Sequence, residues 1–315
     1  MQAFFFDRHT IPLPPGHRFP ASKYRLLRER LDGHPGLRLT EAPAATDGEL
    51  ALAHAPGYVT DVVEGHLDPA RQREIGFPWS PLMVERSRRS VGATIVAART
   101  ALVEGIAANL GGGTHHASAT QGSGYCVFND VAVAARLMQA EWHRNREGKR
   151  RSLLRVAVID LDVHQGNGTA SIFRDDDTVF TLSLHAASNF PFRKEPGDLD
   201  VALPDGCRDD EYLPALDDAL EELWRRHGSA PPGLLFYLAG ADPHEGDRLG
   251  RLKLSTAGLL ERDRRVLAAA RRRGIPIALS MAGGYGRVID ETVRVQVGTI
   301  EAALESWRQW NNAPP

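Results

Sequence analysis

Cysteine is scarce in this sequence. The 315-residue chain has two cysteines, Cys126 and Cys207, against twelve histidines. Two thiols cannot build a disulfide framework or a cysteine-rich zinc site. Any metal that this protein holds must therefore be bound by histidine together with aspartate or glutamate.

Net charge and long apolar runs are also lacking. The formal net charge is −2, so no strong field attracts nucleic acid or an anionic membrane. No apolar stretch approaches the roughly 20 residues that span a bilayer, and the run 1–6 lacks the basic start and the cleavage site of a signal peptide. We expect a cytoplasmic protein without direct nucleic-acid or membrane partners. Lysine is scarce, with four lysines among 38 basic residues, which we interpret as genome composition.

Apolar runs of strand length alternate with helical stretches along the chain. The patterns predict strands over Ala3–Phe6, Arg155–Leu161, Val179–Leu184, Gly233–Ala239 and Ile275–Met281. Between Arg8 and Pro56 only Ser22–Leu31 has helical spacing, and further helices are predicted over Pro81–Glu104, Asn129–Arg146, Asp210–His227, Ser255–Arg273 and Arg287–Arg308. Continuous apolar strands separated by helices form parallel sheets that are covered on both faces. We predict an α/β fold, with one domain over residues 1–315 and a mostly parallel central sheet flanked by helices on both faces.

Four polar or glycine-rich segments follow strands in this scheme. They are Gly111–His116, Asp160–Asn167, Gly240–Asp247 and Ala282–Gly286, and the strand before the first of them is the least certain. In open parallel sheets, ligands bind at the carboxyl ends of the strands. The four segments are therefore expected to converge at one edge of the sheet.

The second and third of these segments contain a candidate metal site. Asp160, Asp162 and His164 alternate along an extended chain and so lie on one face. With Asp242, the pair Asp162 and His164 gives one histidine and two carboxylates, which leave an open position as a catalytic zinc site requires. The alternative is a strand that ends in a polar turn, with His244 and Asp247 as surface residues.

The other two segments carry candidate catalytic groups. His115 and His116 follow three glycines and offer an acid–base pair near neutral pH. They can equally be a pair on a solvated loop or part of a second metal site. The Tyr285 hydroxyl, on a glycine loop, can donate to a developing oxyanion, although the loop can also be an ordinary turn.

Taken together, the segments resemble the histone deacetylase family of the arginase–deacetylase superfamily. The matching stretches are GGGTHHA at Gly111–Ala117, GYCVFND at Gly124–Asp130, DLDVHQGNGT at Asp160–Thr169, TLSLH ending at His185, GADPHEGDRLG at Gly240–Gly250 and GGYG at Gly283–Gly286. Their order agrees with that family from about residue 85 to 300. The early residues 17–20 and 23–24 look most like the class IV-like and bacterial branches.

The resemblance implies a Zn²⁺-dependent amidohydrolase acting on Nε-acyl-lysine. Asp162, His164 and Asp242 match the zinc ligands. Among the family's catalytic residues, His116 matches the general base and acid, and Tyr285 the group that polarises the amide carbonyl. His115 matches the first tandem histidine and Asp160 its partner, whereas Asn167 stands beside His116 where some members carry aspartate. Fe²⁺ can compete with zinc for such a donor set.

The resemblance also implies a second ion and a substrate channel. Family members hold a buried monovalent cation, usually potassium, at the positions of Asp160, Asp162, His164, Ser183 and Leu184. The narrow channel for the acyl-lysine stem is expected to be lined by Gly124, Tyr125 and Phe190. The expected partner is an acylated lysine of a protein or peptide, or a small acylated amine.

One departure from the family concerns the channel rim. Members often place an acidic residue there, but the segment Ile75–Ser80 has no carboxylate, which leaves a rim formed by Phe77 and Trp79 or a site for small substrates. An acetylpolyamine amidohydrolase is the main alternative. A non-catalytic acyl-lysine-binding protein is less favoured, because His115, His116 and Tyr285 are all present. An arginase-type enzyme is disfavoured, since 242–247 lacks the repeated carboxylates of a paired Mn²⁺ site.

Overall fold

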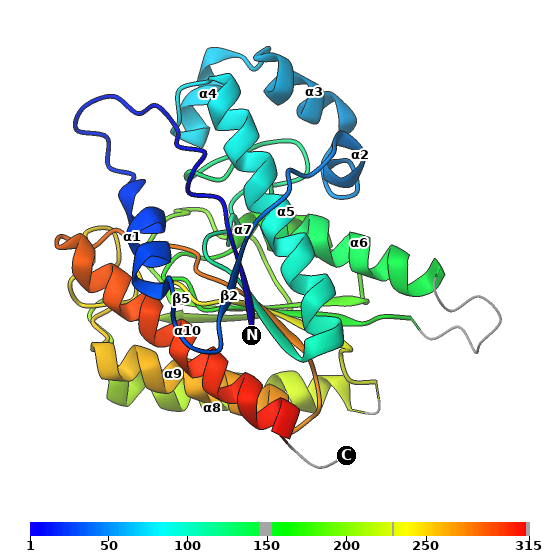
Figure 1. Ribbon diagram of the computed structural model, residues 1–315, viewed down its shortest axis with the longest axis vertical. Helices are drawn as coiled ribbons and strands as arrows, with labels where there is room; N and C mark the ends of the chain where they lie inside the picture. Colours follow the sequence, from blue (N-terminus) through cyan, green and yellow to red (C-terminus); the bar gives the residue numbers. More distant parts are fainter. Residues whose placement is uncertain (145–152, 229, 313–315) are drawn as a thin grey trace.

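Eight parallel strands form one twisted sheet in the computed structural model, which describes residues 1–144, 153–228 and 230–312 (Figure 1). The strand order is β2-β1-β3-β8-β7-β4-β5-β6, and each neighbouring pair of strands runs parallel. The strands are β1 (Gln2–Phe5), β2 (Arg38–Glu41), β3 (Ile106–Asn109), β4 (Val156–Asp160), β5 (Val179–Ala186), β6 (Leu199–Leu203), β7 (Leu234–Leu238) and β8 (Ile277–Ser280). The predicted α/β class is confirmed, and the sheet is parallel throughout.

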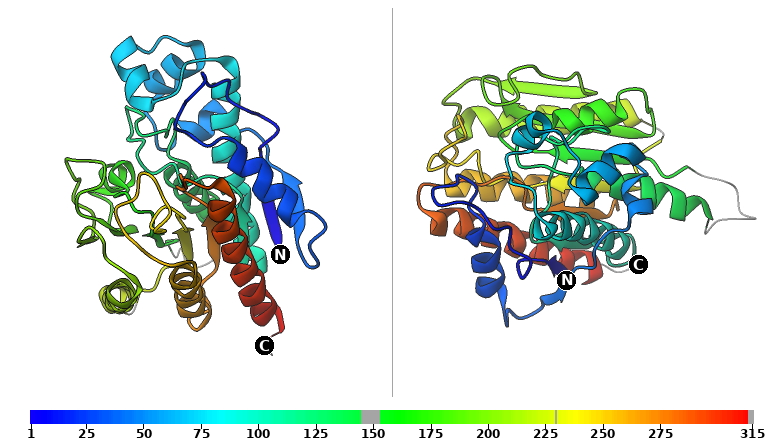
Figure 2. Two further views of the ribbon diagram at one scale, coloured as in Figure 1. Left: turned by 90° about the vertical axis from the view of Figure 1, so that its left-hand side faces the viewer. Right: turned by 90° about the horizontal axis from the view of Figure 1, so that it is seen from above.

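Helices cover both faces of the sheet (Figure 2). One face packs against α1 (Ser22–Leu31), α8 (Asp209–His227), α9 (Thr256–Arg271) and α10 (Ile289–Asn312). The other packs against α5 (Pro81–Glu104), α6 (Asp130–Arg144) and α7 (Asn167–Phe173), with the short helices α2 (Asp47–Leu50), α3 (Pro56–Glu64) and α4 (Pro69–Ile75) beyond them. None of the helices in the described part of the chain is long and apolar enough to cross a bilayer.

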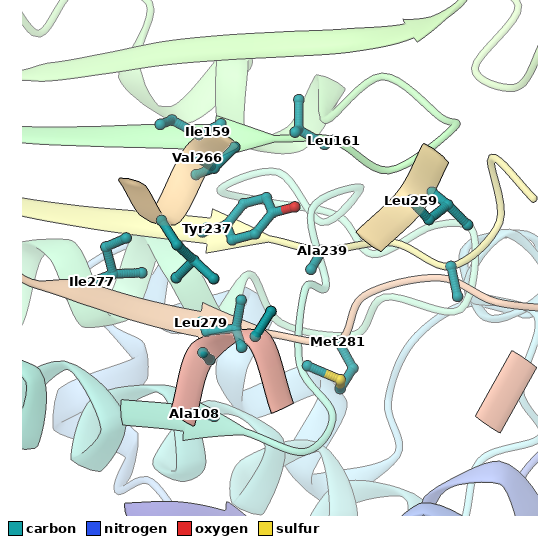
Figure 3. Packing of buried hydrophobic residues seen from close by; sticks show 14 of the residues in the cluster. Ala108, Ile159, Leu161, Tyr237, Ala239, Leu259, Val266, Ile277, Leu279 and Met281 are labelled. Atoms are coloured by element: carbon teal, nitrogen blue, oxygen red, sulfur yellow. The ribbon is translucent and has the colours of Figure 1, made fainter. Parts of the chain in front are cut away.

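The central strands are apolar on both sides because both of their faces are covered. Successive side chains of a strand point to opposite faces. Ile159 and Tyr237 therefore join the core beneath α9, where Figure 3 shows them with Val266. Val158 and Phe236 join the core beneath α5 and α6. This double burial explains why β4 and β7 read as continuous apolar runs in the sequence.

The ends of α5 illustrate how local sequence fixes an element. Ser80 caps the helix by accepting a hydrogen bond from the Met83 amide, and Pro81 occupies the first turn, where a missing N–H costs nothing. Gly105 ends the helix with a φ of 86°. The helix runs over Pro81–Glu104, as the sequence predicts.

Most other predicted elements are present within two or three residues, and the exceptions have physical reasons. The predicted helix 129–146 is observed as α6 up to Arg144, and its last two residues lie outside the described residues. The edge strands β2 and β6 are absent from the prediction because they are short and alternate between exposed and half-buried positions for most of their length. Between residues 8 and 56 the chain also forms α2, a single four-residue turn held by a Thr46–Glu49 capping box.

The sheet order brings the four polar segments together. They follow β3, β8, β7 and β4, and these four strands are consecutive neighbours in the centre of the sheet. The uncertain strand before Gly111 is present as β3. The predicted convergence at the carboxyl edge of the sheet is therefore what the fold produces.

Candidate active site

Asp162, His164 and Asp242 form a buried cluster at this edge. Asp162 and His164 follow β4 and Asp242 follows β7, and one ligand atom from each lies within 4.8 Å of the others. The His164 Nδ1 atom is 2.9 Å from Asp162 Oδ1 and 3.3 Å from Asp242 Oδ2. All three side chains can therefore reach one ion.

The free atoms and charges of this cluster fit a divalent cation. Asp242 Oδ2 is fully enclosed yet has no hydrogen-bond partner among the described residues. Burial lowers the pKa of His164, but Asp162 and Asp242 outweigh it and raise this pKa to about 10. Burial and the charge of Asp162 raise the pKa of Asp242. A dry site that concentrates negative charge around imidazole and carboxylate donors suits zinc.

Gly283 lets the GGYG loop come close to this cluster. Its amide donates to Asp162 Oδ2 at 2.7 Å, and a Cβ at this position would lie 1.9 Å from Asp242 Oδ2. Any side chain here would displace a candidate ligand. Glycine is therefore required by close approach of the backbone.

The loop that carries the tandem histidines is shaped by Asp130 at the start of α6. This carboxylate is buried and accepts hydrogen bonds from the amides of Gly113 and Thr114 and from the hydroxyls of Thr94 and Thr114. Acceptance of several bonds satisfies a charge that would otherwise be costly to bury. Asp130 thus fixes the path of the chain into His115 and His116.

The two histidines sit in different electrostatic environments. His115 Nδ1 lies 2.6 Å from Asp160 Oδ2; burial lowers the pKa of His115, but Asp160 and Asp162 raise it to about 9. His116 Nδ1 lies 2.7 Å from Asn167 Oδ1, a neutral acceptor. Burial, together with charge on His115 and His164, keeps the pKa of His116 well below 6.5. His116 is therefore held neutral, as a general base must be.

Tyr285, on the GGYG loop, lies beside the metal cluster, as we call the side chains of Asp162, His164 and Asp242. Asp247 Oδ2 accepts from the Tyr285 amide at 2.6 Å, and the Lys23 ammonium donates to the carbonyls of Ala282 and Gly284 at 3.2 Å each. Burial and the negative charge of Asp162 raise the pKa of the Tyr285 phenol well above 10. The hydroxyl thus remains protonated at neutral pH and available as a donor.

A cavity of about 380 Å³ opens onto these groups. Its wall includes all three predicted channel residues, and Phe190 packs against His116 with ring centroids 4.9 Å apart. Tyr125 has a φ of 66°, a conformation that is strained for a non-glycine residue and that recurs at functional sites. The structure therefore joins Gly124, Tyr125 and Phe190 to the predicted catalytic groups.

The expected rim is wrong in one respect. Phe77 is buried beneath Tyr125, with ring centroids 5.3 Å apart, and Trp79 donates to the Val62 carbonyl; neither lines the cavity. Glu74, one residue before the stretch without carboxylates, does line it and hydrogen-bonds to Gln121. The rim has an acidic residue after all, because α4 ends there and turns its last residues toward the opening.

The residues predicted to bind potassium separate into three groups. Asp160 and Ser183 are register partners on β4 and β5 and line a cavity of about 10 Å³, together with Thr181 and Asp200. Asp162 and His164 belong to the metal cluster. Leu184 is part of the core.

Sequence reasoning missed several residues that position the site. Asp247 is not a surface residue: it is 3% exposed and also accepts from the amides of Leu249 and Gly250. His244 lies outside the metal cluster and contacts Thr256. Lys23 reaches the GGYG loop from α1, and its position beside Tyr24 in a helix gives no signal of this contact.

Arg262 on α9 supports the metal cluster from behind. It is fully buried, and its Nη1 donates to the carbonyls of Leu161 at 3.2 Å and Gly240 at 2.7 Å. Each of these carbonyls is within two residues of a candidate ligand. The Arg262 Nη2 atom lies 2.8 Å from Asp263 Oδ1, and Asp263 Oδ2 accepts from Thr299. The sequence pattern marks residue 262 only as a helix position.

Comparison with known proteins places the chain in a family. Residues 17–299 match the family model described as Histone deacetylase domain. Histone deacetylase 2 of Arabidopsis thaliana is 38% identical over 300 residues, which cover 90% of this chain and 73% of that protein. The histone deacetylase-like amidohydrolase of Pseudomonas aeruginosa is 29% identical over 323 residues, covering 90% and 81%. The chain belongs to the histone deacetylase family.

The fold agrees with this assignment. A crystal structure of an HDAC homolog complexed with SAHA has a TM-score of 0.78 and 25% sequence identity to this chain, and the match covers 96% of this chain and 83% of that one. The protein is thus an enzyme of the deacetylase and amidohydrolase class, with a candidate metal site at the edge of the sheet where the strand order brings the polar loops together.

Proposed function

We propose that this enzyme is a zinc-dependent amidohydrolase that removes acetyl or other acyl groups from Nε-acyl-lysine. One observation carries the proposal. Two members of the buried cluster, Asp162 and His164, line the same cavity as the neutral His116 and the protonated Tyr285. The aromatic walls of Tyr125 and Phe190 suit the aliphatic stem of lysine, whose charge is removed by acylation.

The metal would be held by Asp162, His164 and Asp242. Bound there, zinc would supply Lewis-acid chemistry, polarising the amide carbonyl and lowering the pKa of water toward about 7. Fe²⁺ is the competing ion for this donor set. We also propose a structural potassium ion near Asp160 and Ser183, and the small cavity between their strands supports it.

The protein groups carry the proton transfers. His116 takes a proton from the attacking water, whose oxygen forms the new bond to the acyl carbon. The Tyr285 hydroxyl donates to the oxygen of the carbonyl as negative charge develops on it. As the C–N bond breaks, His116 returns the proton to the leaving lysine amine.

His115, Asp160 and Asn167 are assigned supporting roles. Asp160 orients His115 and stabilises its protonated form. The charge on His115, in turn, lowers the pKa of the adjacent His116. Asn167 holds His116 through Nδ1 without adding negative charge, which leaves Nε2 for the substrate side.

A substrate panel tests this function. The zinc-loaded enzyme and Tyr285→Phe are assayed on acetyl-lysine and longer acyl-lysine peptides and on acetylputrescine. We expect hydrolysis of an acyl-lysine peptide that falls at least a hundredfold in the variant. Preference for acetylputrescine would make the enzyme an acetylpolyamine amidohydrolase. Binding of acyl-lysine with no turnover of any chain length would support the non-catalytic alternative, and substantial turnover by Tyr285→Phe would contradict the role of Tyr285.

A further inference from the structure

A second charged group lines the same cavity, and the proposed mechanism does not use it. Arg86 extends from α5 and is 7% exposed. Its guanidinium carbon lies 4.7 Å from the ring centroid of Tyr24, 5.2 Å from that of Phe6 and 5.3 Å from that of Phe19. Within the described part of the chain it makes no hydrogen bond and no ion pair. The aromatic rings contact the cation through their faces, but they give its N–H groups no oxygen acceptor.

A guanidinium in this state is unusual. It has five N–H donors and stays charged in proteins. A buried charge is costly unless it is paired and hydrogen-bonded. Cation–π contacts offset part of this cost and fix the plane of the group. Because Arg86 lines the cavity, its N–H groups are suited to donate to an acceptor on a bound ligand.

The neighbours of Arg86 are also donors without partners. Ser90 lies one helical turn further along α5, is 3% exposed and lines the cavity. Among the described residues, neither the Ser90 hydroxyl nor the Tyr24 hydroxyl has a hydrogen-bond partner, and Tyr24 also lines the cavity. Arg86, Ser90 and Tyr24 are therefore neighbours in the cavity wall, with the buried Lys23 ammonium 5.1 Å from the Tyr24 ring.

No carboxylate balances this charge from the cavity wall. Of the residues that line the cavity, two carry carboxylates, Glu74 and Asp162. Glu74 is exposed at the opening and bonds to Gln121, and Asp162 belongs to the metal cluster. The end of the cavity near Arg86 is thus positively charged and rich in donors, which is the environment that a carboxylate requires.

We propose that Arg86, with Ser90 and Tyr24, binds the terminal carboxylate of a dicarboxylic acyl group, such as succinyl, glutaryl or adipoyl, on the substrate lysine. This inference rests on the proposed function and specifies its substrate. The lysine stem lies between Tyr125 and Phe190, the amide lies at Tyr285, and the acyl chain continues toward Arg86. Hydrolysis consumes one water, breaks the amide C–N bond, forms a C–O bond and releases lysine and the free dicarboxylate.

The test compares matched pairs of acyl-lysine peptides that differ in charge alone. Each dicarboxylic acyl group is paired with its terminal amide: succinyl with succinamoyl, glutaryl with glutaramoyl, and adipoyl with adipamoyl. For at least one chain length we expect the zinc-loaded wild type to give a kcat/KM at least tenfold higher for the acid. In Arg86→Met this ratio should fall to about one, and Arg86→Lys should restore part of it.

Two further variants keep the test independent of folding. Ser90→Ala should lower the acid-to-amide ratio severalfold, because it removes one donor without removing the buried cation. Arg99→Met, on the same helix but paired with the surface residue Glu141, should leave the ratio at the wild-type value. A ratio that falls equally in Arg99→Met would overturn the assignment to Arg86.

The wild-type measurement alone can also overturn the proposal. Equal or slower hydrolysis of every acid relative to its amide, with acetyl-lysine still hydrolysed, would reject the carboxylate site and leave the proposed function standing. A third outcome combines this lack of acid preference with inhibition by free glutarate or acetate that depends on Arg86. It would show that the site binds the released carboxylic acid product, and it would also reject a dicarboxylic substrate. No hydrolysis of any acyl-lysine would reject the proposed function itself.

Discussion

Two buried arginines on opposite faces of the sheet show how differently one side chain can be used. Arg262, behind the metal cluster, is paired with Asp263 and donates to two loop carbonyls. Arg86, at the cavity, has three aromatic rings around it and no anion among the described residues. Both are enclosed, so the difference lies in their partners and not in their exposure.

This difference separates the groups that stabilise the fold around the site from the groups that bind or react with the substrate. The charge of Arg262 is balanced within the protein by Asp263, although its Nη2 atom makes no hydrogen bond in the described structure. The desolvation cost of this pair and the stabilisation it gives therefore both belong to folding. The region of the candidate active site leaves three groups without hydrogen-bond partners among the described residues: Asp242 Oδ2, the Tyr285 hydroxyl and the Arg86 guanidinium. Substitutions in the first region should change stability, and substitutions in the second should change binding and catalysis.

Removing the metal should give the largest effect on activity, and this effect should be confined to the second region. Incubation with dipicolinate is expected to reduce activity below detection, because in the proposed function Asp162, His164 and Asp242 hold the ion that the chemistry requires. Re-addition of Zn²⁺ should restore it, and Fe²⁺ should be tested alongside. Far-ultraviolet circular dichroism should retain the helical signal. Activity that is insensitive to the chelator, with metal analysis showing an empty site, would contradict the metal assignment.

Arg262→Met should have the largest effect on stability. It leaves Asp263 buried without its cation, and breaking a buried pair in this way costs about 3–5 kcal/mol. Urea unfolding monitored by fluorescence measures the loss. The matched control is Arg86→Met, which breaks no ion pair in the described structure and should change the free energy of unfolding by less than about 1 kcal/mol. Equal losses in the two variants would remove the distinction between the regions.

Tyr285→Phe should show the opposite pattern. Loss of one oxyanion donor typically lowers kcat about 10²–10³-fold. The Tyr285 hydroxyl has no hydrogen-bond partner among the described residues, so its removal should change stability by less than about 1 kcal/mol. Steady-state kinetics and thermal unfolding of the same preparation check both statements. A variant that unfolds readily would place Tyr285 with the structural groups.

Asn167→Asp should give the smallest change, a shift in pH dependence. In the proposed mechanism the base is neutral His116, whose pKa is held well below 6.5 by burial and by charge on His115 and His164. A carboxylate 2.7 Å from its Nδ1 would stabilise the protonated ring and raise that pKa. The acid limb of kcat/KM should therefore move upward by about one pH unit, so the variant loses activity at a higher pH than wild type.

The control for this shift removes the amide without adding charge. Asn167→Ser should lower activity through looser positioning of His116 while leaving the acid limb where it is in wild type or lower. A pH–rate profile of Asn167→Asp that superimposes on the wild-type profile would show that Asn167 does not set the protonation of His116.

The metal cluster and the two tandem histidines could be found in the sequence because each sits directly after a strand. A buried parallel strand is visible as an apolar run, and the edge where such strands end is known in advance. Asp162, His164 and Asp242 follow the ends of two such strands, β4 and β7. The same reasoning could not find Arg86, since its apolar partners Phe6, Phe19 and Tyr24 belong to other elements.

Glu74 and Asp247 show where local patterns mislead. Glu74 lies one residue before the stretch without carboxylates, and nothing in its local sequence shows that it lines the cavity. Asp247 follows a loop glycine and looks exposed, yet it holds the backbone of Tyr285 from 38 positions away. Whether a carboxylate is solvated or buried depends on which backbone amides surround it, and those amides are assembled only when the loops meet.

The sequence by itself determined the class of fold, the edge of the sheet that carries the site and the donors that gather there, because periodicity and strand ends are local properties. Tertiary structure alone decided which charges are neutralised. Lys23 bonds to carbonyls about 260 positions away, Arg262 bonds to the carbonyls of Leu161 and Gly240 in two other loops, and Arg86 meets no anion at all in the described chain. Charge compensation is a matter of distance in space, and distances in space are set by how the helices pack on the sheet.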